Sequence, residues 1–402
     1  MKKAPLPFLV SAVVILLAFI MFAIWGIPYF LQPPSFEQSG SAYGSQIIRA
    51  RVTEILEEGQ IKLGENPQAY QVLLVELLEG KYQGILIEVD YGKRQLRNDD
   101  YAFSPGDEMY VQLGMDLDGV LTAYYVDYVR TKPLLILLGI FILATILLGR
   151  WKGVGSLLAL AFTMLMIIGY IVPHILSGED PLRVSLIGST IMLGTTLYLT
   201  YGWNIKTHAS VLSVVLALLL TGLLSILFVS LTRLTGSGEE SSLFLIQFSE
   251  VTINLRGLLL GGMLIGALGV LDDLVSSQSA AVFEIHDANP SLTFRQIFEG
   301  SMRIGRDHVA ATVNTLVLAY TGASLPLLLL FTLGSGRYGV LLNAGFVSEE
   351  IVRMLVGSLG LIAAVPITSF IATTFVLHGN RLGEWQVLLG SRTGNGEHRH
   401  PH

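Results

Sequence analysis

Two adjacent carboxylates, Asp272 and Asp273, follow an apolar, glycine-rich run near the centre of residues 257–286. This apolar run is about fifteen residues long, whereas a membrane-spanning helix needs roughly 20. A span at this position must therefore either end at the aspartates or include them. In the second case two ionisable side chains lie at membrane depth, where they are costly and typical of functional sites. The apolar residues 280–283 favour this case, but a short span that ends at Leu271, with both aspartates solvated at the inner interface, stays open.

Two neighbouring carboxylates in a low-dielectric site should not both ionise easily, so one of them can hold and release a proton. Asp272 and Asp273 are therefore the candidate proton relay. Helical spacing places Asp273 and Ser277 on one face with three glycines, Gly262, Gly266 and Gly269. Because small residues let helices pack closely, we expect this face to meet another helix and Asp273 to point into the bundle.

Several polar residues are expected to surround this pair. On the same helix the aspartates are followed by Ser276, Ser277 and Gln278. The next apolar helix follows a short connection, so it is predicted to be the antiparallel neighbour. It supplies three further candidate partners, His308, Asn314 and Thr315. Histidine can titrate near neutral pH, although a histidine next to a charged Arg-Asp pair also fits an ordinary interfacial residue.

The sequence lacks the motifs of the common enzyme classes. It has no cysteine, which excludes a thiol nucleophile and a zinc–thiolate site. It also has no G-x-S-x-G, no P-loop and no H-E-x-x-H, and a diaspartyl protease would need carboxylates in two separate spans. We therefore expect no enzyme activity, no cofactor and no bound metal.

The composition indicates a polytopic membrane protein, because 52% of the 402 residues are hydrophobic and only 14% are charged. A net charge of −6 offers no basic surface for nucleic acid. The apolar stretch 6–31 follows Met1-Lys2-Lys3 and is predicted to be an uncleaved anchor. Seven further apolar runs are long enough to cross a bilayer, namely 133–149, 153–176, 182–202, 207–232, 256–282, 309–333 and 350–378.

The distribution of charge predicts how these eight spans are oriented. Positive residues near span ends favour the cytoplasmic side. A cytoplasmic N-terminus places most of the loop cations inside and several acidic residues outside. Both termini are then expected to be cytoplasmic.

Residues 47–131 have the composition of a small β domain between the first and second spans. Five short segments alternate in strand fashion and are bounded by turn signals such as Ser104-Pro105-Gly106-Asp107. Five strands in about 85 residues predict a small, OB-like barrel. The order of the spans places this barrel outside the cytoplasm, where it either binds a small-molecule or protein partner or carries no ligand.

The predicted fold class is thus an all-α polytopic membrane bundle of about eight transmembrane helices with a small extracytoplasmic β-barrel. The corresponding boundaries are an anchor at 1–32, a linker at 33–46, the β domain at 47–131, a seven-helix membrane domain at 132–379 and a cytoplasmic tail at 380–402.

The stretch 265–331 resembles the signature region of the YibE/F family of bacterial multi-span membrane proteins. The resemblance rests on G-x-x-D-D-x-x-x-S-Q at 269–278, N-P-S-L at 289–292 and G-R-D-H-x-x-x-T-V-N-T-L at 305–316. Together with the anchor, the β domain and the later spans it covers nearly the whole chain. It implies a multi-pass protein of the bacterial cytoplasmic (inner) membrane, and it defines architecture better than function.

A more distant resemblance is to one half of the resistance–nodulation–division transporters and to SecD and SecF. One helix of those proteins carries an acidic proton-relay motif, which Asp272 and Asp273 match, and a later helix ends near a Leu-Pro pair, as at Leu325-Pro326. This resemblance implies proton coupling. The chain departs from the pattern because no span interior offers a lysine or arginine, the β domain is smaller and the predicted spans are more numerous.

Two functions are therefore expected. The first is a proton-coupled permease or energised membrane device of unknown substrate, whose outer β domain recruits a substrate or partner. The second is a non-transporting scaffold or assembly protein whose outer β domain binds partners. The sequence defines membrane lipid as a partner and leaves a homo-oligomer open.

Overall fold

The structure, a computed structural model, describes residues 47–378 apart from 64–65, 94–101, 116–119, 239, 249–250, 327–328 and 330–337. The predicted anchor at 1–32, the linker at 33–46 and the tail at 380–402 therefore lie outside the described residues. The chain divides into two compact units, and Ala144 is the last residue of the unit that contains the strands.

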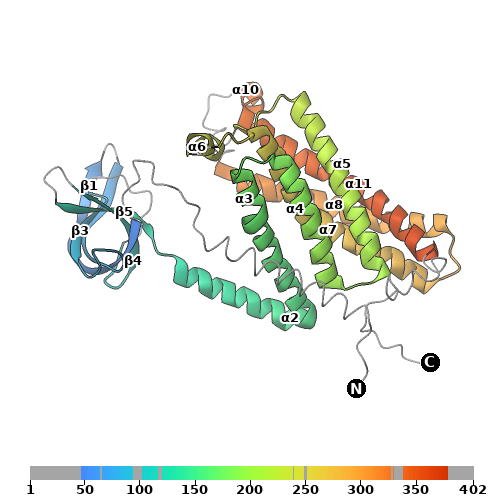
Figure 1. Ribbon diagram of the computed structural model, residues 1–402, viewed down its shortest axis with the longest axis horizontal. Coiled ribbons are helices and arrows are strands. Elements are labelled where there is room, and N and C mark those ends of the chain that lie inside the picture. Colours follow the sequence, from blue (N-terminus) through green and yellow to red (C-terminus); the bar gives the residue numbers. More distant parts are fainter. Residues whose placement is uncertain are drawn as a thin grey trace, which may run out of the picture. The chain divides into compact units, whose positions relative to one another are not determined.

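The predicted β domain is confirmed as a closed five-stranded barrel with the order β1-β2-β3-β5-β4 (Figure 1). Its strands are β1 (Ile47–Leu63), β2 (Asn66–Leu77), β3 (Leu86–Tyr91), β4 (Glu108–Met115) and β5 (Leu121–Tyr128). The long β1 pairs with both β2 and β4, and β3 and β5 run parallel. A small five-stranded barrel is the architecture of OB-like domains.

Alternating side chains fill the inside of this barrel, as the period of two in a strand requires. On β4, Met109, Val111 and Leu113 are buried, while the residues between them are only partly buried. The buried side-chain amide of Gln71 links β2 to the backbone of Phe103. It donates to the carbonyl of Phe103 at 3.2 Å and accepts from the Phe103 N–H at 2.8 Å.

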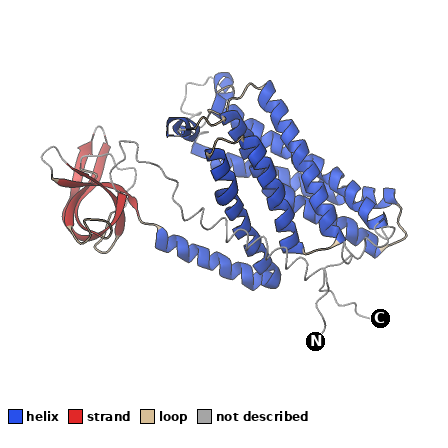
Figure 2. Cartoon of the chain, viewed as in Figure 1, coloured by secondary structure: helices blue, strands red, loops and turns tan. Residues whose placement is uncertain are grey.

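The remaining described elements are helical (Figure 2). The long helices are α2 (Thr131–Met166), α4 (Pro181–Tyr201), α5 (Ile205–Leu231), α7 (Leu255–Ala288), α8 (Phe294–Ala323) and α11 (Gly345–His378). The shorter elements are η1 (Ile167–Ile171), α3 (Val172–Leu176), α6 (Glu240–Phe248) and α10 (Tyr338–Leu342). α2 breaks at Arg150, whose φ of 49° and ψ of −130° are not helical.

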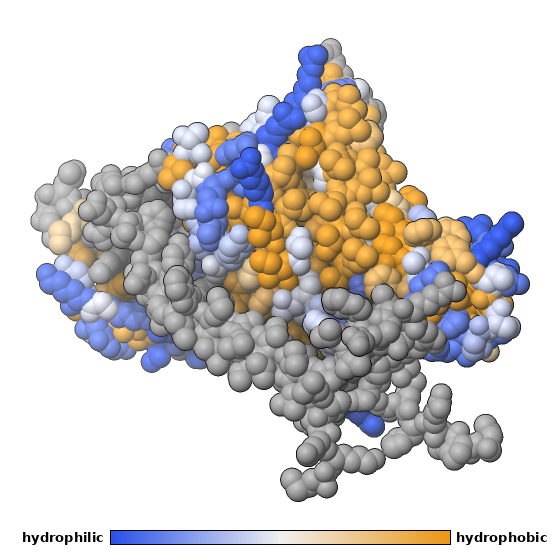
Figure 3. All heavy atoms as spheres, turned by 45° about the vertical axis from the view of Figure 1, so that its right-hand side comes forward, coloured by the Kyte–Doolittle hydropathy of each residue, from blue (hydrophilic) through white to orange (hydrophobic). Residues whose placement is uncertain are grey.

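Six helices of the described chain are long and apolar enough to cross a membrane, and apolar side chains cover much of the visible face of the helical part (Figure 3). They are Thr131–Arg150, Gly153–Leu176, Pro181–Tyr201, Ile205–Leu231, Leu255–Ala288 and Gly345–His378. These match six of the seven predicted runs after the anchor. The seventh run, 309–333, falls on the second half of α8, which is not among the six, and on residues partly outside the described chain. The predicted count of about eight spans is therefore not confirmed.

α7 is the central helix of this unit. It packs against α4, α5, α8 and α11. Its residues Leu264, Leu271 and Leu274 belong to the main apolar cluster, together with Leu218 of α5 and Leu361 of α11. The helix that carries the two aspartates is thus held on several sides.

Candidate functional site

α7 runs without interruption through both aspartates. Asn254 caps its start, because the Asn254 side chain accepts a hydrogen bond from the Gly257 N–H at 3.0 Å. The helix continues to Ala288, so Asp272 and Asp273 lie near its midpoint. The local sequence contains no proline or glycine after Gly269 that would end the helix sooner.

Asp272 occupies a partly enclosed position on α7. Its Oδ1 atom is buried and has no hydrogen-bond partner among the described residues. One and two turns further along the same face, Ser276 and Ser279 meet neighbouring helices. The Ser276 hydroxyl lies 3.1 Å from the Tyr201 hydroxyl, and the Ser279 hydroxyl donates to the Lys206 carbonyl at 3.3 Å. This face of α7 therefore lies against the end of α4 and the start of α5.

Asp273 does not point into the bundle, contrary to the prediction from glycine spacing. It is exposed, as are Gly262, Gly266 and Gly269 on the same face. A Cβ atom added at Gly262 or Gly269 would have no neighbour within 4 Å among the described residues, whereas one at Gly266 would lie 2.7 Å from the Tyr320 hydroxyl of α8. Of the three glycines, only Gly266 thus approaches another helix within the described chain.

Another pair of glycines on α7 makes the close contact instead. A Cβ at Gly261 would lie 2.4 Å from the Ser185 Oγ and 3.1 Å from the Pro181 carbonyl oxygen of α4. One at Gly257 would lie 3.2 Å from Pro181. The physical reason for the correction is that both glycine rows satisfy the same spacing rule. The Gly257–Gly261 row lies closely against α4, whereas the row of Gly262, Gly266 and Gly269 approaches a helix only at Gly266.

The polar residues after the aspartates connect α7 with α8 and α11. The Ser277 Oγ lies 3.3 Å from Nδ1 of His308, so the expected neighbourhood of these two residues is formed. The buried Gln278 Nε2 donates to the Ser301 carbonyl and to the Ser369 hydroxyl, both at 2.8 Å. Its Oε1 atom is buried without a partner among the described residues. Gln278 therefore ties three helices together.

Asn314 and Thr315 are not brought to the aspartates. Both are exposed, and the Thr315 hydroxyl donates to the Ala311 carbonyl of its own helix at 2.8 Å. At this level α8 packs on α11, where a Cβ added at Gly357 would lie 3.6 Å from Leu316. The two residues are thus exposed on a part of α8 whose buried Leu316 packs on α11, although α8 still approaches α7 further along, at Tyr320.

Tyr201, Ser301 and Ser369 are the site residues that the sequence did not single out. Tyr201 closes the predicted span 182–202, and a tyrosine at a span end is usually read as an interfacial anchor. A related cluster adjoins it, because the Tyr198 hydroxyl lies 2.6 Å from Nδ1 of His208 and its ring stacks on Trp203 at 4.8 Å. The only available signal was the spacing of three between the two tyrosines.

The arrangement can accept or donate protons but does not resemble a metal centre. In the part of the chain that the structure describes, no group of three or more histidine, aspartate or glutamate side chains could hold a metal ion. Ser276 and Ser279, on the same face of α7 as Asp272, carry hydroxyl groups, which can both donate and accept hydrogen bonds. The chemistry that this geometry supports is therefore the binding and release of a proton or a small polar group.

Comparison with known proteins gives one match. The model of the family described as YibE/F-like protein matches residues 137–378, from the first described span to the end of α11. No curated protein and no solved structure matches the chain. The family model covers more than half of the sequence, and the six apolar helices among the described residues fit an integral membrane protein. The chain therefore belongs to the YibE/F-like family.

Proposed function

We propose that the chain is a proton-coupled permease, or a related energised membrane device, in which Asp272 binds and releases the proton. The observation that carries this proposal is the enclosed Asp272 Oδ1 atom, which has no donor among the described residues. An ionised carboxylate without hydrogen bonds is costly in an apolar setting. A carboxyl group in this position is therefore suited to carry a proton.

The length of α7 supports a position of Asp272 at membrane depth. Asp272 lies about 26 Å along the axis from Leu255 at the helical rise per residue. The hydrocarbon core of a bilayer is about 30 Å thick. A core that begins at the first turn of α7 therefore still includes Asp272, close to its far boundary. This supports the reading in which the span includes the aspartates.

Asp273 has a second role in the proposal. It is exposed on the adjacent face of α7, next to the Ser277–His308 pair. A negative charge on Asp273 lies close to Asp272, and repulsion between like charges favours a proton on Asp272. Asp273 thus modulates the proton occupancy of Asp272.

The orientation completes the proposal. The charge bias of the loops supports an orientation in a bacterial inner membrane with both termini in the cytoplasm and the barrel on the outer side. There the barrel recruits the substrate or a partner, and the chain itself catalyses no covalent reaction.

Proton flux into proteoliposomes tests this proposal. The full chain is reconstituted with an internal pH dye, and a pH step or potential drives protons inward. We expect flux in the wild type and at least a tenfold loss in Asp272→Asn, with a smaller loss in Asp273→Asn. Asp287→Asn is the matched control, because Asp287 is an exposed aspartate in the last turn of the same helix. Equal flux in Asp272→Asn and the wild type would contradict the proposal.

Chemical labelling gives an independent readout. Dicyclohexylcarbodiimide reacts with a protonated carboxyl group in an apolar setting. We expect labelling at Asp272 and none at Asp287. A folded protein whose Asp272 stays unlabelled at pH 6 would count against a protonated carboxyl group.

The competing function, a non-transporting scaffold, is favoured by one feature of the barrel. Tyr124 and Val126 are neighbouring exposed side chains of β5, with 51% and 40% of their surface exposed. Such a pair of exposed apolar side chains is typical of an interaction surface. A scaffold predicts that Tyr124→Ser with Val126→Ser abolishes cellular function while Asp272→Asn with Asp273→Asn leaves it unchanged.

A further inference from the structure

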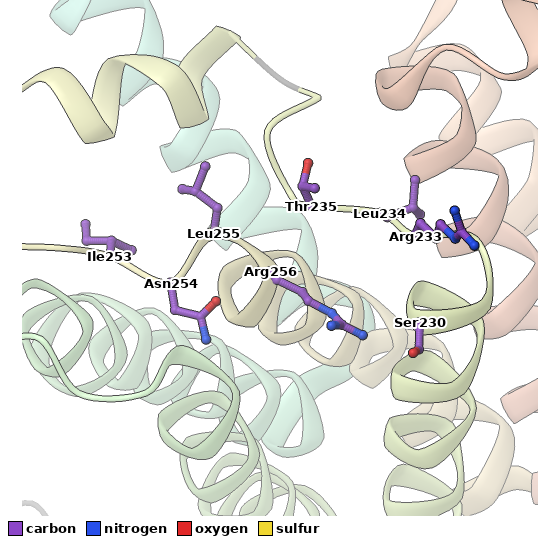
Figure 4. A pocket seen from close by; sticks show the side chains of 8 residues that line it. All are labelled: Ser230, Arg233, Leu234, Thr235, Ile253, Asn254, Leu255 and Arg256. Atoms are coloured by element: carbon purple, nitrogen blue, oxygen red, sulfur yellow. The ribbon is translucent and has the colours of Figure 1, made fainter.

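An open pocket of about 560 Å³ lies where α5 ends and α7 begins (Figure 4). Its polar lining includes Ser230, Arg233 and Thr235 on the side of α5, and Asn254 and Arg256 on the side of α7. Figure 4 shows the Arg256 side chain extending from the start of α7 toward the end of α5, where Ser230 and Arg233 lie. Two cationic side chains, one just after α5 and one at the start of α7, therefore share one pocket.

Within the part of the chain that the structure describes, neither guanidinium is paired with an acidic side chain. Arg233 and Arg256 are both exposed, and their side chains make no hydrogen bond or ion pair with a described residue. Of the other described arginines in the helical unit, Arg295 pairs with Glu299 at 2.7 Å and Arg353 pairs with Glu350. Like charges that share a pocket repel each other, so an anion in this pocket is stabilised by both.

The backbone at Arg233 gives a second, independent observation. Arg233 has a φ of +55°, in the left-handed region that favours glycine. The Leu234 N–H bonds to the Val229 carbonyl at 3.0 Å, and both side chains are buried in one cluster. This is the arrangement of a Schellman motif, in which glycine is the usual residue at the left-handed position. Arginine thus occupies a position that suits glycine, and its side chain lines the pocket.

The donors match a phosphate group better than a carboxylate. Each guanidinium presents five N–H donors in a planar fork, and two forks supply more donors than the two oxygens of one carboxylate can use. A phosphate group offers more acceptor oxygens and is bound by arginine in a bidentate manner.

The surroundings fit such a ligand. Leu234 and Ile253 add buried apolar surface beside the arginines. The pocket lies at the ends of two helices that can span a membrane, which is the level where lipid headgroups reside. We propose that Arg233 and Arg256 bind the phosphate group of an anionic ligand in this pocket, either a lipid headgroup or a soluble phosphate ester. The proposed phosphate site is separate from Asp272, so its test does not depend on proton flux.

Binding by the purified full chain tests the proposal with two probes. The lipid arm uses native mass spectrometry with phosphatidylglycerol, and the soluble arm uses calorimetry with sn-glycerol 3-phosphate. We expect at least one probe to bind, and we expect its affinity to fall at least tenfold in Arg233→Gly and in Arg256→Gln. The arm that shows this loss identifies the source of the phosphate.

Three comparisons make the result decisive. Arg183→Gln is the control, since Arg183 is an exposed arginine at the start of α4 that does not line the pocket. Arg233→Gly places glycine at a left-handed position, so a fold that stays intact assigns the lost binding to the guanidinium; should that variant not fold, Arg256→Gln alone decides. Affinity that is the same in the wild type and both pocket variants overturns the proposal, as does tighter binding of malate, a dicarboxylate, than of either phosphate probe.

Discussion

The hydroxyl of Tyr201 donates a hydrogen bond to the Ser276 Oγ across 3.1 Å and joins the last turn of α4 to the middle of α7. The direction follows from the Ser276 hydroxyl, whose own proton is given to the Asp273 carbonyl at 3.1 Å. Ser276 lies one turn after Asp272 on the same face. A phenol from another helix therefore enters the polar row that contains the enclosed carboxyl.

Replacing Tyr201 by phenylalanine removes this donor and little else. The side chain is 45% exposed, so its loss of packing is small. A hydrogen bond contributes about 1 kcal/mol, and we expect proton flux in proteoliposomes to fall roughly fivefold to tenfold. Tyr124→Phe, at an exposed tyrosine of the barrel, should leave flux unchanged. A wild-type rate in Tyr201→Phe would show that this phenol only supports helix packing.

The two neighbouring glycines Gly261 and Gly262 should respond differently to alanine. A Cβ at Gly261 would lie 2.4 Å from the Ser185 Oγ, whereas one at Gly262 meets nothing within 4 Å. Overpacking costs about 1–3 kcal/mol, so Gly261→Ala should lower the melting temperature in detergent by several degrees. Gly262→Ala should keep or raise it, because alanine favours helix by up to about 1 kcal/mol.

Equal melting temperatures of the two variants would show that α7 does not pack on α4 at this level. A loss of stability in Gly262→Ala alone would restore the original expectation that its face meets a helix, supplied by a second copy of the chain or by residues outside the described ones.

The difference between Gly261 and Gly262 shows which structural information the periodicity of a sequence provides. Spacing predicts which residues share a face of α7, and that part is geometry of a single helix. It does not say which face meets a neighbour, because the partner depends on contacts far apart in sequence. The barrel was easier to predict, since each strand carries its own alternation and turns. Its closure through β1, which pairs with both β2 and β4, required the structure.

The candidate site likewise combines contacts that the sequence predicts with contacts that only the structure shows. The neighbourhood of Ser277 and His308 was predictable, because a short connection makes α7 and α8 adjacent and antiparallel. Tyr201 and Ser369 come from helices that no short connection links to α7. Asn314 is expected near the aspartates because it lies on the adjacent helix, but it is exposed. α8 stays beside α7 as far as Tyr320, whose hydroxyl approaches Gly266. Adjacency in sequence thus predicts that the two helices pack, and not which side chains of α8 face α7.

Gly305 should be sensitive to alanine because it lies where α7, α8 and α11 meet. An added Cβ would lie 2.4 Å from Val365 Cγ1 of α11 and 2.9 Å from Gln278 Oε1 of α7. The added methyl group must displace the amide of Gln278, which holds Ser301 and Ser369. We expect Gly305→Ala to reduce stability by about 1–3 kcal/mol, measured by thermal unfolding in detergent.

Gly300→Ala is the matched control on the same helix. Its Cβ would lie 3.5 Å from Ile285 Cδ1, an ordinary contact, so helix propensity should dominate and stability should not fall. If both variants unfolded at the wild-type temperature, the three-helix contact around Gln278 would not be a stabilising feature.

Glu108 should give the barrel a defined pH dependence. Its carboxylate accepts a hydrogen bond from Arg51 at 3.2 Å and lies 3.7 Å from the Lys132 ammonium. The hydrogen bond from Arg51, supported by the positive charge of Lys132, holds the pKa of Glu108 below its ordinary value of 4.5. A carboxylate with a lowered pKa stabilises the fold above that ordinary value, and this contribution is lost as the pH falls below it.

Hydrogen exchange of the β1 and β4 amides in the full chain measures this loss. Protection factors, corrected for the intrinsic pH dependence of exchange, should fall between pH 6 and pH 3 in the wild type. Glu108→Gln removes the titrating group, so its protection should be lower at pH 6 and should change less on acidification. Glu58→Gln, at an exposed glutamate of β1, should behave as the wild type. A Glu108→Gln variant with the full wild-type pH response would assign the acid sensitivity of the barrel to other carboxylates.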